Sequence, residues 1–597
     1  IRWISDMSSS IDGAVSANDG IALGATFIVG KTKIIDDGKA PVLVNSVPEN
    51  NGSGVSANGK VVLTFDKKVM LTSAAKAHIG TTDLTPVVNG KTVTCEYKGL
   101  TYSTNYTFTL AAGSVADLTG NNVIKEDITI AFETKVKPAV TKGTYDAIVS
   151  TSEELDAAIV AASKRADQNS RYRIFIKNGK YVLAGSGEEK TTTVELANGT
   201  EATKTFKNPI TYFKSSNVSF IGEDYSKVII TNKAGDLETY EGKYGLACVA
   251  EGIGNGDVLQ NSGTLNYFQG VTIKTSMGDA RGRDIAYQDK GNKTIFKDAC
   301  LWGYQDTYTS NNQNGKFYFE GGVIRGRTDY LCGKGDVYYN GVTLQQCGTG
   351  GYLAVPSQAK KYGYVFYNCY IKKETKDVTY YLGRPWGSGT PIACFINTKM
   401  DAAPIGNGWA DMSGGWPKRF AEYNSYLSSG TSIDLSGRRT EWTDKNNEKH
   451  SNDPILTIDD VQSMSLANVM GQDDDWDPTA LTEQAAAPTH VIIQGSTISW
   501  DNSDYVFCWV VFKNGEYAGN TTEPTFSIND ANATWTVRAA NEMGGLSEAT
   551  KAVISTGIHE VEKADDSVSP IYNALGQRIN ANTKGLQISK NGKRIVK

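Results

Sequence analysis

A six-residue pattern of hydrophobic and polar positions recurs through the middle of the chain. Each unit has an aromatic residue, any residue, then Gly, Asn or Asp, two more residues and an apolar residue. It occurs at residues 268–273, 296–301, 319–324, 339–344, 366–371 and 395–400. Successive units are 20 to 29 residues apart. A period of this length predicts a β-solenoid, in which each unit adds one coil to a stack.

A predicted helix and a predicted strand, at residues 172–176, precede the first coils. Residues 151–154 (Thr-Ser-Glu-Glu) read as a capping box, and apolar residues follow on one helical face. We expect this helix to cap the open end of the solenoid, which we assign to residues 138–482. A second helix is predicted over 459–469, and the coil pattern fades after Met400.

Segments with strand-like alternation flank the solenoid. Residues 40–137 hold short alternating runs separated by Asn-Gly and Gly-Asn turns, which predicts a β-sandwich. This segment resembles bacterial immunoglobulin-like modules, including its Ala-Asp-Leu-Thr-Gly-Asn turn at 116–121. Residues 487–556 predict a second sandwich, which resembles a fibronectin type III domain. Residues 1–39 show no clear period, and their structure is not predicted.

The last residues, 557–597, carry the sequences Ile-Tyr-Asn-Ala-Leu-Gly-Gln-Arg at 571–578 and Asn-Gly-Lys-Arg-Ile-Val-Lys at the end. They resemble the C-terminal sorting domain of type IX secretion substrates in Bacteroidetes. The alternative is a short β-hairpin tail. The resemblance implies a secreted or cell-surface bacterial protein, exported through the outer membrane.

Composition narrows the classes of function. The 597 residues carry a net charge of −5 with 21% charged residues, so nothing indicates binding to nucleic acid or an anionic membrane. No apolar run approaches the roughly 18 residues of a membrane helix. The eight cysteines form no CxxC pair, and five fall among the coils. Stacked apolar thiols are therefore favoured over disulfides.

Histidine is absent between residues 140 and 440. A Ser-His-Asp triad or a histidine metal cluster inside the solenoid is therefore excluded, and we expect neither metal nor cofactor. Carboxylate chemistry remains.

Two aspartates share one phase of the repeat. Asp306 lies ten residues after Phe296, and Asp329 lies ten residues after Phe319. In a solenoid the two side chains would lie one above the other, about 5 Å apart. Two carboxylates at this separation do not both ionise easily, so one should keep a proton while the other attacks a carbonyl. The alternative is that both are ladder residues that bond backbone turns.

Three further residues suit the same chemistry. Gln305 can donate an amide N–H to a developing oxyanion. Arg384 can fix the ionised acid through a bidentate pair, and Trp386 offers a flat apolar platform for a sugar ring.

These residues also lie in motifs that resemble a known family. Residues 303–307 (Gly-Tyr-Gln-Asp-Thr), 329–333 (Asp-Tyr-Leu-Cys-Gly) and 382–386 (Leu-Gly-Arg-Pro-Trp) are similar, in order and spacing, to the three signature blocks of pectin methylesterases. The likeness covers about 145 to 480. It implies an all-β, right-handed parallel β-helix of the pectin lyase-like kind, which removes methyl groups from galacturonate esters of pectin without a metal.

The resemblance also assigns roles. Asp329 would be the nucleophile, and Asp306 would be the acid that assists methanol departure and then the base that activates water. Gln305 would stabilise the tetrahedral anion, Arg384 would hold Asp329, and Trp386 would line the substrate cleft. The expected partner is pectin, and the protein is expected to be a monomer.

The sequence departs from the family at three positions. Arg283 stands where a second oxyanion glutamine is usual, Cys332 replaces a phenylalanine, and Leu183 replaces a glutamate. Loss of one oxyanion donor typically costs roughly 100- to 1,000-fold in rate. Arg283 could supply a charged donor, or could pair with Asp284 and contribute nothing.

Basic residues cluster near these motifs: Arg281, Arg283, Arg325, Arg327 and Lys334. They either hold free galacturonate carboxylates or form solvated coil edges. Two other functions stay open at this point: a catalytically impaired pectin binder, or another pectin-active carbohydrate enzyme such as a retaining glycosidase, which also needs carboxylates about 5 Å apart.

Overall fold

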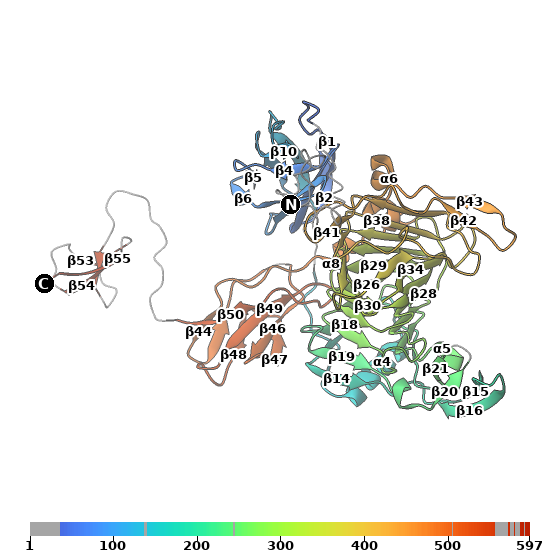
Figure 1. Ribbon diagram of the computed structural model, residues 1–597. Helices are drawn as coiled ribbons and strands as arrows, with labels where there is room; N and C mark the ends of the chain where they lie inside the picture. The colour runs from blue at the N-terminus through green and yellow to red at the C-terminus, as the bar shows by residue number, and fades with distance from the viewer. Residues whose placement is uncertain are drawn as a thin grey trace, which may run out of the picture.

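The computed structural model describes residues 36–136, 140–242, 245–503 and 505–555, with 571–573, 578–579, 585–589 and 592–596 in the tail. Most of the segment 1–39 and much of 557–597 therefore lie outside the described residues. The described chain forms a long stack of strands with a β-sandwich near each end of the sequence (Figure 1).

The stack is a parallel β-helix built from three sheets, as the repeat predicts. Neighbouring strands within each sheet are parallel and come from successive coils. The ten-stranded sheet contains β12 (Ala147–Val149), β13 (Tyr172–Ile176), β18 (Val218–Gly222), β23 (Tyr267–Gln269), β26 (Thr294–Lys297), β29 (Lys316–Glu320), β32 (Asp336–Asn340), β35 (Tyr364–Tyr367), β38 (Ile392–Ile396) and β40 (Arg419–Tyr423). The nine-stranded sheet contains β14 (Gly179–Val182), β19 (Val228–Thr231), β24 (Thr272–Lys274), β27 (Cys300–Trp302), β30 (Val323–Gly326), β33 (Thr343–Gln346), β36 (Tyr370–Lys373), β39 (Lys399–Met400) and β41 (Tyr426–Leu427). The seven-stranded sheet contains β17 (Thr211–Phe213), β22 (Leu259–Asn261), β25 (Tyr287–Asp289), β28 (Tyr308–Ser310), β31 (Thr328–Lys334), β34 (Gly351–Gln358) and β37 (Tyr380–Gly383).

The aromatic residue of each repeat points into the solenoid and stacks on the next. Ring centroids along this ladder lie 4.2 to 5.0 Å apart, and the rings are close to parallel. The members are Phe220, Phe268, Phe296, Phe319, Tyr339, Phe366 and Phe395. The stack fixes the register of the coils, so residues at one phase of the repeat recur on one face.

The solenoid extends further than the repeat indicates. Strands β40 and β41 add another coil after Met400. Here Trp409 packs between Phe395 and Phe420, with centroids 5.9 and 4.6 Å away. The register pairs Phe395 with Glu422, so a buried acid that is paired with Arg438 replaces the aromatic residue of the repeat in this coil, and the sequence signal fades early.

The first helix caps the stack as predicted. Helix α4 (Ser152–Lys164) has a capping box made by Thr151 and Glu154, and buries Leu155, Ala158, Ile159 and Ala162. The prediction of one continuous helix over 459–469 is wrong, because this segment forms two short helices. The chain forms α6 (Ile458–Ser463) and α7 (Leu466–Gly471), because Ser465 starts a new helix by accepting the Asn468 N–H. Helix α8 (Pro478–Thr482) follows.

The N-terminal sandwich comprises a four-stranded and a five-stranded sheet with a two-stranded ribbon. Its strands are β1 (Leu43–Val47), β2 (Gly52–Val55), β3 (Gly59–Phe65), β4 (Val69–Leu71), β5 (Ala77–Ile79), β6 (Thr82–Leu84), β7 (Pro86–Asn89), β8 (Thr92–Tyr97), β9 (Asn105–Leu110), β10 (Val115–Asp117) and β11 (Ile128–Thr134). It contacts the last coil, where Asn424 Oδ1 accepts the Lys91 N–H at 3.2 Å.

The C-terminal sandwich packs against the outside of the solenoid. Its two four-stranded sheets hold β44 (Ile492–Gln494), β45 (Thr497–Ser499), β46 (Cys508–Lys513), β47 (Glu516–Thr521), β48 (Thr525–Ser527), β49 (Trp535–Ala540), β50 (Thr550–Lys551) and β51 (Val553–Ile554). Phe507 and Val510 share an apolar cluster with Phe175 and Ile221 of the ten-stranded sheet. In the tail, β52 (Ile571–Tyr572), β53 (Arg578–Ile579), β54 (Gly585–Ser589) and β55 (Gly592–Val596) form a small antiparallel sheet.

Hairpins and short helices interrupt the early and late coils. They are β15 (Glu189–Glu195) with β16 (Glu201–Lys207), β20 (Thr239–Gly242) with β21 (Gly245–Cys248), η1 (Ala234–Asp236), α5 (Glu251–Gly254), and β42 (Glu441–Thr443) with β43 (Lys449–Ser451). The first two hairpins and α5 protrude at one end of the stack (Figure 1).

Candidate active site

A cleft of about 870 Å³ follows the seven-stranded sheet on the outside of the solenoid. Its lining residues all fall between 245 and 412, so neither sandwich contributes to it. Asp306, Asp329, Gln305, Arg283 and Trp386 line it together. The structure thus brings these sequence-predicted residues to one place.

The two aspartates lie on adjacent coils in register. Gln305 pairs with Thr328 in a parallel bridge, and the Asp306 N–H donates to the Thr328 carbonyl at 3.0 Å. Both aspartates have left-handed backbone conformations, with φ of 59° for Asp306 and 52° for Asp329. That conformation costs roughly 1 kcal/mol for a residue with a Cβ, and Asp298, Asn368 and Asn397 in turns of other coils adopt it as well, so it is a feature of the coil turns and not of this site alone. The repeat predicts the shared phase but not this backbone geometry.

Arg384 holds Asp329 through a bidentate ion pair. Its Nε donates to Oδ1 at 2.9 Å and its Nη2 donates to Oδ2 at 2.5 Å. The guanidinium lies over the Tyr352 ring, 4.0 Å from the centroid. Burial raises the pKa of Asp329, which is 6% exposed, while the Arg384 pair opposes that rise. The paired carboxylate is the form that can act as a nucleophile.

The surroundings of Asp306 favour its protonated form, in contrast to those of Asp329. Burial, followed by the nearby Asp329 charge, raises the pKa of Asp306 well above its ordinary value, and the Arg283 charge opposes this rise. No comparable cation pairs with its carboxylate among the described residues. These surroundings favour the protonated form of Asp306 and the ionised form of Asp329, which has Arg384 as its counter-ion.

Arg283 does not pair with Asp284. Its Nε donates instead to Glu251 Oε1 at 2.9 Å, and both residues line the cleft. Asp284 is buried and accepts the Thr275 hydroxyl at 2.7 Å and the Gln305 N–H at 3.3 Å. Burial raises the pKa of Asp284 to about 7. Glu251 is the residue that sequence reasoning missed, because it lies in α5, where the coil pattern gives no signal.

The other four residues of the predicted basic cluster differ in burial and in whether they line the cleft. Arg325 is buried and pairs with Asp279 at 2.8 Å and Glu374 at 3.1 Å. Arg281 and Lys334 are not among the lining residues, whereas Arg327 is. The cluster is therefore not one continuous basic groove. Cys332 also lines the cleft, with its sulfur 3.3 Å from the Thr309 hydroxyl.

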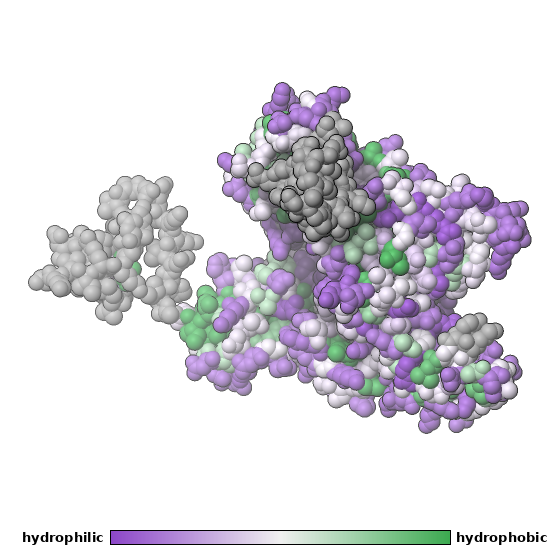
Figure 2. Space-filling view, in the orientation of Figure 1, coloured by the Kyte–Doolittle hydropathy of each residue, from purple (hydrophilic) through white to green (hydrophobic). Residues whose placement is uncertain are grey.

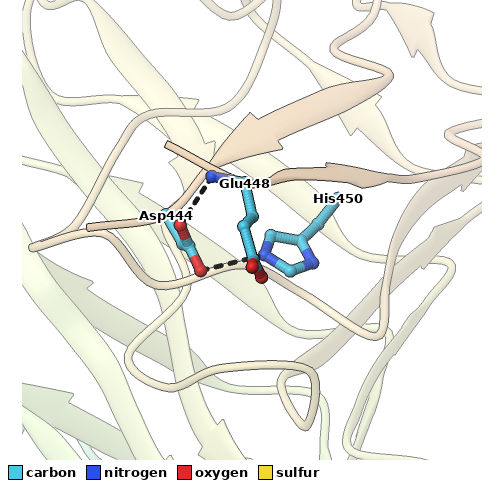
Figure 3. A group of neighbouring side chains, drawn as sticks. All are labelled: Asp444, Glu448 and His450. Atoms are coloured by element: carbon cyan, nitrogen blue, oxygen red, sulfur yellow. Dashed lines mark hydrogen bonds and ion pairs between the residues drawn. The ribbon is translucent and has the colours of Figure 1, made fainter. Parts of the chain in front are cut away.

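One group of metal-type ligands lies apart from the cleft, on the β42–β43 hairpin. Asp444, Glu448 and His450 place one ligand atom each within 4.8 Å of the others (Figure 3). Asp444 Oδ1 already accepts the N–H groups of Asn446 and Glu448, at 2.8 and 2.9 Å. These bonds close the hairpin turn, and Asp444 Oδ2 also lies 3.3 Å from His450 Nε2, so the Asp444 carboxylate already has partners within the hairpin. Figure 2 shows mostly hydrophilic residues over this hairpin.

In the part of the chain that the structure describes, no helix is long and apolar enough to cross a membrane. All eight cysteines are free thiols, and seven of them are buried, as the favoured interpretation expects.

The fold and the site define a parallel β-helix with a carboxylate pair in its cleft. Residues 210–455 match the model of the pectinesterase family, and residues 37–134 match that of the bacterial Ig-like domain. The chain therefore contains one segment that is similar to the pectinesterase family and another that is similar to the bacterial Ig-like domain.

Curated relatives are similar over part of their length. "Putative pectinesterase 11" of Arabidopsis thaliana is 27% identical over 199 residues, which is 32% of this chain and 54% of that protein. "Pectinesterase A" of Dickeya dadantii (strain 3937) is 29% identical over 204 residues, 28% of this chain and 54% of that protein. The chain thus spans about half the length of these relatives.

Solved structures of similar proteins include the pectin methylesterase from carrot. It is 17% identical, with a TM-score of 0.43, over 58% of this chain and 99% of that chain. Pectin methylesterase PemA from Erwinia chrysanthemi is 20% identical, with a TM-score of 0.38, over 56% of this chain and 99% of that chain.

Proposed function

We propose that the chain is a carboxylic ester hydrolase that removes methyl esters from homogalacturonan, the polymer of pectin. The observation that carries the proposal is the Asp329–Arg384 bidentate pair next to an Asp306 whose pKa is raised, in one cleft. One acid is held ionised and the other protonated, which is the division of labour that ester cleavage needs. The matching family and relatives are pectinesterases by name.

In the first half of the proposed reaction, a carboxylate oxygen of Asp329 attacks the ester carbonyl carbon. The carbonyl oxygen becomes an oxyanion, which the Gln305 side-chain amide stabilises by donating an N–H. When the tetrahedral intermediate collapses, the bond to the methoxy oxygen breaks. Asp306 gives its proton to that oxygen, so methanol leaves and an anhydride joins Asp329 to the sugar.

In the second half, Asp306 is an ionised base. It takes a proton from a water molecule, whose oxygen attacks the anhydride carbonyl of the sugar. The bond to Asp329 breaks, which restores its ion pair with Arg384, and Asp306 keeps the proton taken from water. The product acid then releases the second proton to solvent and becomes a galacturonate carboxylate. Trp386, which is 47% exposed in the cleft, offers its face to a sugar ring during both steps.

The activity test is methanol release by the intact chain. We expect methanol, and no new reducing ends, from pectins of several esterification levels. Pectin affinity by calorimetry without methanol would favour the impaired binder. New reducing ends without methanol would favour a glycosidase, because that reaction cuts the polymer rather than the ester.

Arg283 takes the place of the second oxyanion donor in this proposal. Its Nε is occupied by Glu251, so the terminal nitrogens remain to face the ester, and a cation suits a developing negative charge. Glu251 then positions the guanidinium.

Arg283→Ala is expected to lower kcat by about 100-fold, because one donor to the oxyanion is lost. Arg283→Gln, which restores an amide, should stay within about tenfold of the unchanged enzyme. The measurement is kcat and KM for methanol release. An unchanged kcat in Arg283→Ala would show that Arg283 contributes nothing, and a large rise in Arg283→Gln would show that arginine is the poorer donor.

The remaining assignments concern the flanking segments. We propose that residues 487–556 are a fibronectin type III-like module and that 557–597 direct export to the cell surface or medium. We also propose that the enzyme works as a monomer and without a cofactor, because Asp306, Asp329 and Gln305 of one solenoid supply the nucleophile, the acid and base, and the oxyanion donor of the proposed reaction.

A further inference from the structure

Arg327 is distinct from the other cations of the cleft. Among the described residues, Arg283 and Arg327 are the cationic side chains that line it. Arg283 is neutralised by Glu251, but the hydrogen bonds that Arg327 donates to described residues all go to uncharged oxygens. Arg327 lies only two residues before Asp329, so its charge stands next to the proposed nucleophile.

The Arg327 side chain is held firmly in place. Its Nε and Nη2 both donate to the Thr349 carbonyl, at 3.0 and 2.8 Å, and its Nη1 donates to the Thr328 hydroxyl at 2.7 Å. Its guanidinium also lies 5.9 Å from the centroid of the Tyr304 ring.

Two glycines make room for the stem of Arg327. A Cβ at Gly348 would come within 2.7 Å of the Arg327 Cδ, and one at Gly351 within 2.2 Å of the Arg327 carbonyl oxygen. The turn at 347–351 therefore fits against an arginine in this conformation. The fit indicates a preorganised group rather than a freely solvated side chain.

The N–H groups of Arg327 that have no acceptor in the described part of the chain show what the side chain can still bind. A guanidinium has five N–H groups, and three are used by Thr349 and Thr328. One N–H on each terminal nitrogen is left without a partner among the described residues. Two parallel N–H groups match the two oxygens of a carboxylate.

We propose that Arg327 binds the free carboxylate of an unesterified galacturonate residue next to the sugar whose ester faces Asp329. The inference rests on the proposed function and adds a specificity-determining residue, Arg327, which selects partly de-esterified over fully esterified polygalacturonate. A methyl ester carries no charge, so it cannot replace the carboxylate in this pair. Trp386 in the same cleft receives a sugar face, so binding combines stacking with one specific charge.

The first experiment measures binding without catalysis. Calorimetry with a fully de-esterified oligogalacturonide compares the unchanged protein with Arg327→Thr and Arg327→Gln. We expect about tenfold weaker binding in both variants, because one charge-assisted bidentate pair is lost. Lys361→Thr is the matched control: it removes one positive charge from an exposed residue that does not line the cleft, and it should leave the affinity within about twofold.

The second experiment compares kcat/KM for methanol release from partly and from fully esterified oligogalacturonides. Arg327→Gln should lower the ratio of the two values, partly over fully esterified, by about tenfold, because the loss of a positive charge beside Asp329 affects both substrates alike and cancels in the ratio. Unfolding curves of Arg327→Thr and Arg327→Gln establish that each variant is folded.

The outcomes separate this inference from the proposed function. Weaker oligogalacturonide binding in the Arg327 variants supports the carboxylate site even if no methanol is ever released. Equal loss on both ester substrates, or unchanged oligogalacturonide affinity in folded Arg327→Gln, overturns it while leaving the esterase intact.

Discussion

Asp329→Asn is expected to lower kcat/KM for methanol release by at least about 1,000-fold, because a neutral amide is not a nucleophile for an ester. The substitution keeps the size of the side chain, so the cleft retains its shape. It also removes one charge from the bidentate pair, which leaves Arg384 partly buried without its counter-ion. Affinity for pectin should change far less than the rate, because Asp329 acts on the reacting carbon rather than on the rest of the polymer.

Asp298→Asn provides a matched control for this variant. Asp298 also has a left-handed backbone, with φ of 44°, but its side chain is 58% exposed and does not line the cleft. Methanol release by Asp298→Asn should stay within about twofold of the unchanged enzyme, as expected for an exposed surface position. Activity of Asp329→Asn above one-tenth of the original would rule out Asp329 as the nucleophile.

The repeat pattern was sufficient to predict the scaffold and the pairing of the two acids. One aromatic side chain per coil fills the same place in the core, so Phe296 and Phe319 stack at 4.7 Å and bring their coils into register. Once the coils are in register, residues ten positions further along fall in the same phase. Asp306 and Asp329 therefore meet through a periodicity that the sequence displays directly.

The partners of the arginines could not be predicted in the same way. Arg283 meets Glu251, which lies 32 residues earlier in a short helix outside the repeat. Arg325 and Arg327 are two positions apart, yet the first is buried between two acids and the second lines the cleft. These differences depend on where hairpins and turns fold back, which a coil period does not encode.

The C-terminal sandwich is not an isolated spacer, because it packs against the solenoid. The C-terminal sandwich contributes Phe512 and Phe507 to the same apolar cluster as Tyr318 of the solenoid. Its Arg538 Nη1 donates to the Glu223 carbonyl at 2.9 Å. Alternation along strands predicts that a sheet has an apolar face but not that a neighbouring domain covers the outside of the solenoid.

Asp306→Asn separates the two halves of the proposed reaction. We expect kcat to fall by about 100- to 1,000-fold, since both the acid for methanol departure and the base for water are lost. The substituted amide can still donate a hydrogen bond to the departing methoxy oxygen but cannot take a proton from water, so hydrolysis of the anhydride slows more than its formation. Rapid-mixing measurements should therefore show a burst of roughly one methanol per enzyme before slow turnover, the kinetic mark of an accumulating acyl-enzyme.

The pH dependence of methanol release tests whether Asp306 is the acid. In the unchanged enzyme, activity should rise with pH as Asp329 loses its proton, and fall at higher pH as Asp306, whose pKa is raised by burial and by Asp329, loses the proton that methanol needs. Asparagine resembles the protonated acid but does not titrate. Asp306→Asn should therefore lose the alkaline decline in the burst rate and keep the acidic one, because Asp306 is neutral whenever Asp329 titrates. An alkaline decline that persists in this variant would assign the titrating acid to another residue, and Asp284, whose pKa burial raises to about 7, would be the group to replace next.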